Sequence, residues 1–451
     1  MLKQRRFQLL FGGLALLLVG FGLYQLPFLK GRIDSAVDEI RRDLIYFFRP
    51  PDEAVFQPGQ ATRVLPTAIV VTLTPLASAT PAPSATAGPT LPPTVTPTPL
   101  PAFASLSGVK YVDQHNRWNY CGPANLVMSL KFWGWPGLPG DTRDPRDQVA
   151  YFLKPGIQDP TLDFIQQGKS DKNVMPSEMA AFVNNQTDLR ALLRYGGDIQ
   201  LLKALIAAGF PVVIEKGYFE RDASGKISWL GHYLFVTGYD ESQKGFIVQD
   251  AYLKPGKNLV SKYEDFEIGW RAFNYLFMVV YPPERETELF ETLGLWLDAE
   301  WANQRALQVA QDEIPSLEGI HLFFAWFNKG TSLVSLFDYN EAASAFDQAF
   351  SVYATLGQDD KQRPYRMMWY QTSPYKAYYY SGRYGDVINL ANTTFATIDK
   401  PTLEESLFWR GMAYYASGET QAGIADMREA LRLNYRFDDG RAILQQWGLQ
   451  P

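Results

Sequence analysis

The pattern of apolar and polar positions begins with a long apolar run near the N-terminus. Leu9 to Tyr24 contains no charged residue, and apolar positions continue to Leu29. A helix of about 20 such residues spans the ~30 Å hydrocarbon core of a bilayer. Basic residues precede the run and no small-x-small cleavage site ends it, which favours a transmembrane anchor at 1–30 over the alternative, a cleaved signal peptide.

The next two segments differ in composition. Residues 31–56 form a juxtamembrane segment, in which apolar positions three or four apart predict an amphipathic helix at 33–49. Residues 57–108 are rich in Thr, Pro, Ala and Ser, and no charged residue occurs from Val64 to Val109. Such a segment buries too little apolar surface to fold, so we expect a disordered linker with a reach on the order of 100 Å. Stalks of this composition are commonly external, which favours an extracytoplasmic location for the rest of the chain.

Residues 109–283 show the pattern of a compact domain. Apolar positions at helical spacing predict a helix that begins at Cys121 and further helices at 145–153, 176–185 and 198–208. Short runs rich in β-branched and aromatic residues predict strands at 210–214, 233–239, 245–249 and 275–281. Helices followed by strands indicate an α+β domain, with a helical lobe against an antiparallel sheet.

Beyond Glu284 the pattern is helical throughout, and it repeats. Small and aromatic residues recur at the spacing of a helix–turn–helix unit, at Trp326, Gly330, Tyr339, Ala342, Phe346 and Ala349, and again at Leu407, Gly411, Tyr414, Gly418, Met427 and Ala430. A degenerate copy at 378–384 lies between them. Residues 284–451 therefore resemble tetratricopeptide repeats, which implies an all-α solenoid whose concave face suits a peptide or protein partner. The alternative is an all-α packing domain without a ligand.

Composition narrows the classes of function. The 451 residues are 46% hydrophobic and 20% charged, as in ordinary globular proteins, and a net charge of −6 provides no overall basic surface for nucleic acid. The single cysteine excludes an intrachain disulfide. Three dispersed histidines offer no zinc site with it, and the stretch from Asp141 to Asp147 lacks the spacing of a calcium loop. We therefore expect neither a metal nor a cofactor.

The single cysteine, Cys121, is the candidate nucleophile. It lies at the predicted start of a helix, where unpaired backbone N–H groups and the helix dipole favour the reactive thiolate over the thiol. Pro123 suits the first turn of that helix, because its missing N–H costs nothing there. The alternative is a buried structural cysteine. The side chains around the thiol decide between these interpretations.

A cysteine nucleophile needs a base, and the chain offers His115, His232 and His321. His232 opens a predicted strand, and a polar turn then leads into a second strand that ends at Asp250. If the turn centres on Glu241, His232 lies directly opposite Asp250 in a hairpin, within reach of a hydrogen bond between imidazole and carboxylate.

This arrangement predicts a catalytic triad. Cys121 would be the nucleophile, His232 the general base, and Asp250 the group that orients the ring and stabilises the imidazolium. Taken singly, His232 could be a partly exposed polar residue and Asp250 a turn residue. Their combination in the chain order Cys, His, Asp favours a catalytic thiol.

Three motifs carry a family resemblance: Trp118-Asn119-Tyr120-Cys121-Gly122-Pro123-Ala124 followed by Met128 and Trp133-Gly134, then Gly231-His232-Tyr233-Leu234-Phe235-Val236-Thr237-Gly238-Tyr239, and then Val248-Gln249-Asp250. In this combination, residues 109–283 resemble the papain-like peptidases of family C39 and their C39-like relatives. The resemblance implies a papain-like fold with Cys121, His232 and Asp250 as its triad. It also implies an upstream glutamine that helps to build the oxyanion hole; Gln114 is the available match, and Asn116 lies at a closer spacing.

The resemblance implies a cysteine peptidase that hydrolyses a peptide or isopeptide bond through an acyl-enzyme. The best-known members of the family precede membrane and ATP-binding modules and cleave leader peptides after a double glycine. The sequence shows no second span and no Walker-type phosphate loop, so that substrate is not expected. We expect a membrane-anchored, extracytoplasmic peptidase whose repeats select a protein partner. Two alternatives stay open: a non-catalytic peptide-binding protein, and an acyltransferase that uses the same triad.

Overall fold

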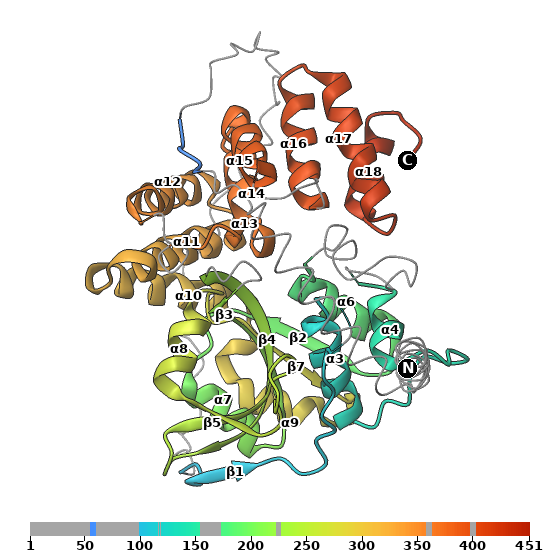
Figure 1. Cartoon of the computed structure of the whole chain (residues 1–451), viewed down its shortest axis with the longest axis vertical. Helices are drawn as coiled ribbons and strands as arrows, with labels where there is room; N and C mark the ends of the chain where they lie inside the picture. The colour runs from blue at the N-terminus through green and yellow to red at the C-terminus, as the bar shows by residue number, and fades with distance from the viewer. Residues whose placement is uncertain are drawn as a thin grey trace, which may run out of the picture.

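The computed structural model describes residues 55–59, 99–115, 117, 119–153, 173–221, 227–357, 363–396 and 403–451. The predicted anchor at 1–30, the predicted helix at 33–49 and most of the predicted linker lie outside these residues. Within the described ranges, no helix combines the length and the apolar character needed to cross a bilayer. The described chain forms a sheet domain up to residue 283, followed by a helical domain, which we call the repeat domain (Figure 1).

An antiparallel sheet forms the centre of the sheet domain. Its strands, among the residues described, are β1 (Phe103–Ser105), β2 (Arg190–Arg194), β3 (Val212–Arg221), β4 (Ile227–Asp240), β5 (Gly245–Gln249), β6 (Leu259–Lys262) and β7 (Phe277–Tyr281). The order across the sheet is β2-β7-β3-β4-β5-β6, and β1 pairs with the end of β4. The long β3–β4 hairpin therefore lies at the middle of the sheet, and β4 carries His232.

Helices cover both faces of the sheet. They are α3 (Cys121–Phe132), α4 (Pro145–Ala150), α6 (Pro176–Gln186), α7 (Ile199–Ala207) and α8 (Tyr263–Arg271). Helices α3 and α6 pack on the face that presents Val213 and Phe235, whereas α7 and α8 pack on the face that presents Ile214 and Leu234. Because both faces are buried, these strands are continuous apolar runs rather than alternating ones.

Several elements escaped the sequence prediction. Strands β2 and β6 and helix α8 were not expected, because their charged ends and short lengths hide the apolar pattern. Strand β1 lies among residues that the sequence assigned to the linker, and it pairs with β4 from Phe103 to Ser105. A three-residue strand with one inward side chain gives no periodic signal.

The repeat domain consists of helices that pack as antiparallel pairs. They are α9 (Glu286–Leu293), α10 (Ala299–Glu313), α11 (Gly319–Ser335), α12 (Tyr339–Thr355), α13 (Met367–Tyr370), α14 (Ser373–Tyr380), α15 (Tyr384–Ala396), α16 (Glu404–Ala416), α17 (Thr420–Leu433) and α18 (Asp438–Gln446). Glycines allow close packing within two pairs: a Cβ on Gly330 would lie 2.7 Å from the ring of Phe346, and one on Gly411 would lie 2.9 Å from the Gly423 carbonyl oxygen. The predicted succession of a sheet-containing domain and a helical region is confirmed.

The two domains share one hydrophobic core. Trp229 and Phe273 of the sheet domain belong to the same buried cluster as Phe324 of α11, and the ring centroids of Trp229 and Phe324 are 5.7 Å apart. Between the domains, Asn274 Nδ2 donates a hydrogen bond to Ser332 Oγ at 3.0 Å. The repeat domain is thus fixed directly onto the sheet domain.

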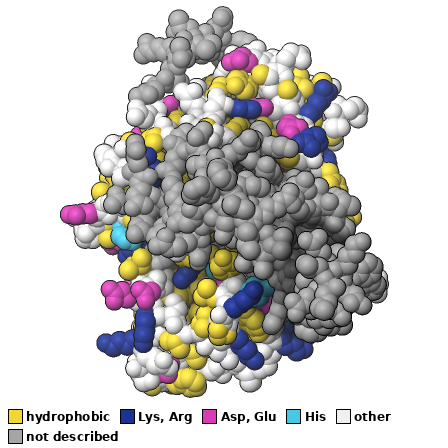
Figure 2. Space-filling view, in the orientation of Figure 1, with side chains coloured by type: hydrophobic (Ala, Val, Ile, Leu, Met, Phe, Trp, Pro, Cys, Tyr) yellow, Lys and Arg dark blue, Asp and Glu magenta, His cyan; other side chains and the backbone are white. Residues whose placement is uncertain are grey.

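Where described residues are visible in Figure 2, side chains of both charge signs are scattered among apolar ones.

Residues 55–59 pack against the repeat domain. Phe56 is buried, and its ring makes an edge contact with Phe350 at a centroid distance of 4.9 Å. The Gly59 N–H donates a hydrogen bond to Asp386 Oδ1 at 2.8 Å. The predicted linker begins at residue 57, but the chain contacts the folded body at Phe56 and again at β1. The described residues on both sides of the Thr/Pro-rich segment, 55–59 and β1, therefore contact the folded body.

Candidate active site

Cys121 is the first residue of α3, as the sequence predicted, and it is buried. The preceding residue, Tyr120, caps no backbone N–H with its side chain; its hydroxyl instead donates to Asp147 Oδ1 at 3.0 Å. The thiol therefore lies at the positive end of the helix dipole. Asn119 adopts a left-handed conformation, with φ of 51°, and turns the chain into the helix.

Asn125 ties the cysteine to the strand that carries the histidine. Its side chain is fully buried, and Nδ2 donates to the carbonyl oxygens of Cys121 at 2.8 Å and Tyr233 at 3.0 Å. These two bonds join the first turn of α3 to β4, one residue beyond His232. The separation between the nucleophile and the proposed base is therefore fixed by a buried polar contact.

His232 and Asp250 form a buried pair. His232 Nε2 lies 3.0 Å from Asp250 Oδ1. Asp250 Oδ1 also accepts the backbone N–H groups of Tyr252 at 2.8 Å and Leu253 at 3.1 Å. Burial tends to raise the pKa of Asp250, but the charge and hydrogen bond of His232 and the two N–H donors outweigh it and lower the pKa to about 2.

The His232 ring interacts with both the Asp250 carboxylate and the Cys121 thiol. Burial tends to lower the pKa of His232, but the charge of Asp250 and hydrogen bonds to Asp250 and Cys121 raise it to about 10. Since Nε2 is occupied by Asp250, Nδ1 is the ring nitrogen that is left for the thiol. This arrangement favours imidazolium over neutral imidazole near neutral pH.

The predicted hairpin register is wrong, although the predicted contact forms. The turn centres between Ser242 and Gln243, not on Glu241, and Asp240 pairs with Gly245. A bulge near Gly238 shifts the register once more, so that the last pair of the β4–β5 ladder joins Phe235 to Gln249. Asp250 reaches His232 from the turn that follows β5, rather than from a position directly across the ladder.

Gln114 lies beside this cluster. Its backbone N–H donates to the Ala251 carbonyl at 2.8 Å, next to Asp250. Its side-chain Oε1 is buried and has no hydrogen-bond partner among the described residues. The assignment of Gln114 to the oxyanion hole stays a prediction, and the alternative residue, Asn116, lies outside the described residues.

Glu215 is a neighbour of the thiol that the sequence reasoning missed. It lies opposite Tyr233 in the β3–β4 ladder and is only 3% exposed. Burial raises the pKa of Glu215 well above its usual value and the charge of Cys121 adds to that effect, while a hydrogen bond with Tyr233 and the charge of His232 oppose it. An acidic residue directly after the apolar run Val212-Val213-Ile214 was the available signal. Burial therefore favours the neutral form of the Glu215 carboxyl group.

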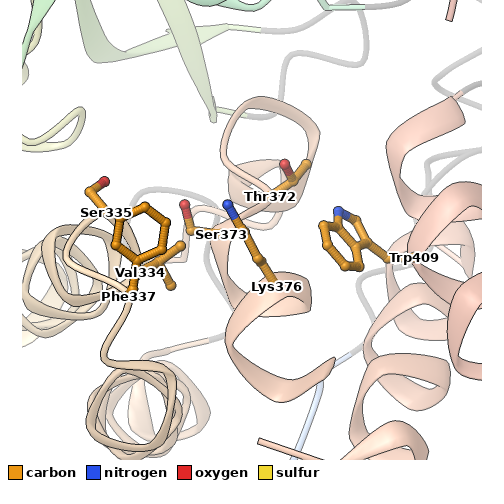
Figure 3. A pocket seen from close by; sticks show the side chains of 7 residues that line it. All are labelled: Val334, Ser335, Phe337, Thr372, Ser373, Lys376 and Trp409. Atoms are coloured by element: carbon orange, nitrogen blue, oxygen red, sulfur yellow. The ribbon is translucent and has the colours of Figure 1, made fainter. Parts of the chain in front are cut away.

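Among the described residues, no metal cluster occurs at this site, and the cavity in the repeat domain lies elsewhere. No three His, Cys, Asp or Glu side chains in the described part of the chain lie close enough together to bind a metal ion. A cavity of about 390 Å³ lies in the repeat domain instead, lined by Val334, Ser335, Phe337, Thr372, Ser373, Lys376 and Trp409 (Figure 3). Cys121, His232 and Asp250 do not line it, so it is a separate feature of the molecule.

Comparison with known proteins finds two similarities, one in each domain. Residues 106–278 match the model of the Peptidase_C39 like family, and residues 325–361 and 404–436 match the tetratricopeptide repeat. A region similar to the C39-like family is thus followed by regions similar to tetratricopeptide repeats. The resemblance stated from the sequence is thereby confirmed. The matched repeats correspond to the pairs α11–α12 and α16–α17, and the degenerate copy corresponds to α14 and α15.

A solved structure of a protein described as a C39-like peptidase from Bacillus anthracis is also similar to part of the chain. The two share 19% sequence identity over 40% of this chain and 96% of the other, with a TM-score of 0.28. No match was found among the curated proteins.

Proposed function

We propose that the chain is a cysteine peptidase whose C39-like domain hydrolyses a peptide or isopeptide bond. The observation that carries the proposal is the buried His232–Asp250 pair on β4, the strand that the Asn125 side chain ties to Cys121. A structural cysteine does not need a paired histidine and carboxylate beside it. The similarity of residues 106–278 to C39-like peptidases supports the same reaction class.

The proposed reaction starts from a Cys121 thiolate and a His232 imidazolium. The Cys121 thiolate attacks the scissile carbonyl carbon, and the carbonyl oxygen becomes an oxyanion. As the tetrahedral intermediate collapses, His232 donates its Nδ1 proton to the leaving amine, and a thioester to Cys121 remains. His232 then takes a proton from a water molecule, which attacks the thioester and releases the acid and the thiolate. Asp250 holds the ring in place and stabilises the imidazolium.

The remaining parts of the proposal rest on the sequence. The apolar run at 1–30 supports attachment to a membrane, and the Thr/Pro-rich segment supports an extracytoplasmic location. The tetratricopeptide-type repeats support contact with a protein partner. A substrate protein held by the repeats would be presented to a site in the adjoining domain.

A peptide library tests the proposed reaction. Wild type is incubated with the library, with Cys121→Ser and His232→Ala as controls, and the products are identified by mass spectrometry. Cleavage that is present in wild type and lost in both variants supports a thiol peptidase. Products joined to an added amine would instead support acyl transfer. The absence of both cleavage and transfer, together with tight peptide binding, would contradict the proposal and favour a binding protein.

A further inference from the structure

A short segment of the repeat domain reaches the cysteine side of the site. Trp369 lies in α13, which connects the first pair of repeat helices to the next. The Trp369 carbonyl oxygen accepts a hydrogen bond from Asn173 Nδ2 at 3.0 Å. Asn173 Oδ1 in turn accepts a hydrogen bond from Asn119 Nδ2 at 3.1 Å. Since Asn119 lies two residues before Cys121, this chain of amides links α13 to the loop that positions the nucleophile.

The same segment reaches the histidine side. Tyr370, the next residue of α13, packs on Gly231, which directly precedes His232. The approach is so close that a Cβ on Gly231 would lie 2.8 Å from Cδ1 of Tyr370. The Tyr370 ring also makes an edge contact with Trp229, two residues before Gly231, at a centroid distance of 5.7 Å.

The Tyr370 hydroxyl interacts electrostatically with Cys121 and Glu215. Burial is the largest of the effects that raise the pKa of Tyr370 above its usual value, whereas the charge of Arg366 and the backbone of Gly231 lower it. The charges of Cys121 and Glu215 raise that pKa further, so both groups lie close enough to act on the hydroxyl. Tyr370 therefore contributes a neutral hydroxyl group to the edge of the site.

We propose that Trp369 and Tyr370 are positioning residues that hold the Cys121 loop and the His232 strand at a fixed separation. This inference rests on the proposed function, which assigns the chemistry to Cys121 and His232. Those two residues come from separate elements, and the attraction between thiolate and imidazolium depends steeply on their separation. One turn of α13 is linked to the Cys121 loop through Asn173 and packs against Gly231, so it restricts that separation as a supporting contact around a catalytic group does. The repeat domain is then part of the catalytic site and more than a partner-binding module.

The pH profile of Cys121 alkylation tests this role in the full-length chain. Because Cys121 is the only cysteine, iodoacetamide labelling followed by intact mass reports it alone. Tyr370→Phe keeps the ring but removes the hydroxyl group, and Asn173→Ala removes the donor to the Trp369 carbonyl. We expect each change to raise the midpoint pH of alkylation by about 0.5 to 1 unit, the effect of one neutral hydrogen bond.

A matched control separates positioning from simple loss of stability. Tyr375 is a buried tyrosine of the repeat domain, and its hydroxyl lies 3.0 Å from both Thr394 Oγ1 and Ser406 Oγ. Tyr375→Phe should lower the unfolding temperature and leave the alkylation profile unchanged. Profiles of Tyr370→Phe and Asn173→Ala that both coincide with wild type would overturn the positioning role while leaving the peptidase proposal intact. A wild-type profile identical to that of His232→Ala would instead refute the peptidase proposal, and the positioning role with it.

Discussion

His232 Nε2 lies 3.0 Å from Asp250 Oδ1, although the β4–β5 ladder does not place the two residues opposite each other. The contact depends on the turn after β5. The Asp250 N–H donates to the Gly256 carbonyl at 2.7 Å, while its carboxylate accepts the N–H groups of Tyr252 and Leu253. The turn thus fixes the carboxylate, and the carboxylate fixes the imidazole.

Replacing Asp250 should change the titration of His232. In wild type, the Asp250 charge and hydrogen bond outweigh burial and raise the pKa of His232 to about 10. In Asp250→Asn the charge is lost while burial remains, so the pKa of His232 should fall by several units. NMR titration of the three histidine rings measures this directly. An unchanged His232 titration in Asp250→Asn would show that the carboxylate does not control the ring.

The contribution of the His232–Asp250 pair to the free energy of unfolding should depend on pH. The pKa of His232 is raised from 6.5, so its contribution is complete below about pH 6.5 and is lost as the pH rises through about 10. The pKa of Asp250 is lowered from 3.8, so its contribution is present above about pH 4 and is lost as the pH falls through about 2. Urea unfolding of wild type and Asp250→Asn should therefore differ most between about pH 4 and 6.5. A difference that is constant from pH 3 to 10 would contradict this window.

Asn125 should be essential for joining α3 to β4. Asn125→Leu has a similar volume but leaves the Cys121 and Tyr233 carbonyl oxygens without their buried donor. We expect a loss of about 2 to 4 kcal/mol in the free energy of unfolding, measured with urea. The exposed Asn340→Leu, in the first turn of α12, serves as the control and should cost little. Equal stability of the two variants would show that the Asn125 contacts do not hold the site together.

Phe56 should anchor the segment before the Thr/Pro-rich linker. Its burial against Phe350 and Tyr378 should stabilise docking by about 2 to 3 kcal/mol. In Phe56→Ala, the Gly59 N–H that donates to Asp386 should therefore exchange faster with deuterium. Phe103→Ala, at a position that is 55% exposed, should leave this exchange unchanged. Rapid exchange at Gly59 already in wild type would contradict the docking.

The sequence predicted the start of α3 and the contact between His232 and Asp250, but not the register of the hairpin. A lone cysteine before a helical pattern and a histidine beside a strand are local signals, and α3 begins at Cys121 as predicted. The register was wrong because turn length and the bulge at Gly238 depend on backbone conformations that composition does not specify. The contact between His232 and Asp250 forms despite this register, because the turn after β5, not the ladder, positions the carboxylate.

Other features lay beyond sequence reasoning because they join distant segments. Nothing in the spacing of Tyr370 or Asn173 indicates that the repeat domain contacts the residue before His232. Likewise, Phe56 ends a three-residue apolar stretch, Ala54-Val55-Phe56, which is too short to show a periodic pattern, so its burial against the repeat helices could not be predicted. Glu215 could have been found from the sequence, because burying a carboxyl group in an apolar strand is costly and indicates a special environment.

The pH dependence of Cys121 alkylation tests the thiolate–imidazolium pair most directly. With iodoacetamide, wild type should label rapidly at pH 5 to 6, whereas His232→Ala should require a pH near the ~8.5 of an ordinary thiol. Asp250→Asn should fall between the two. Slow labelling of wild type at acid pH, with a midpoint equal to that of His232→Ala, would show that Cys121 is an ordinary buried thiol and not the nucleophile of a peptidase.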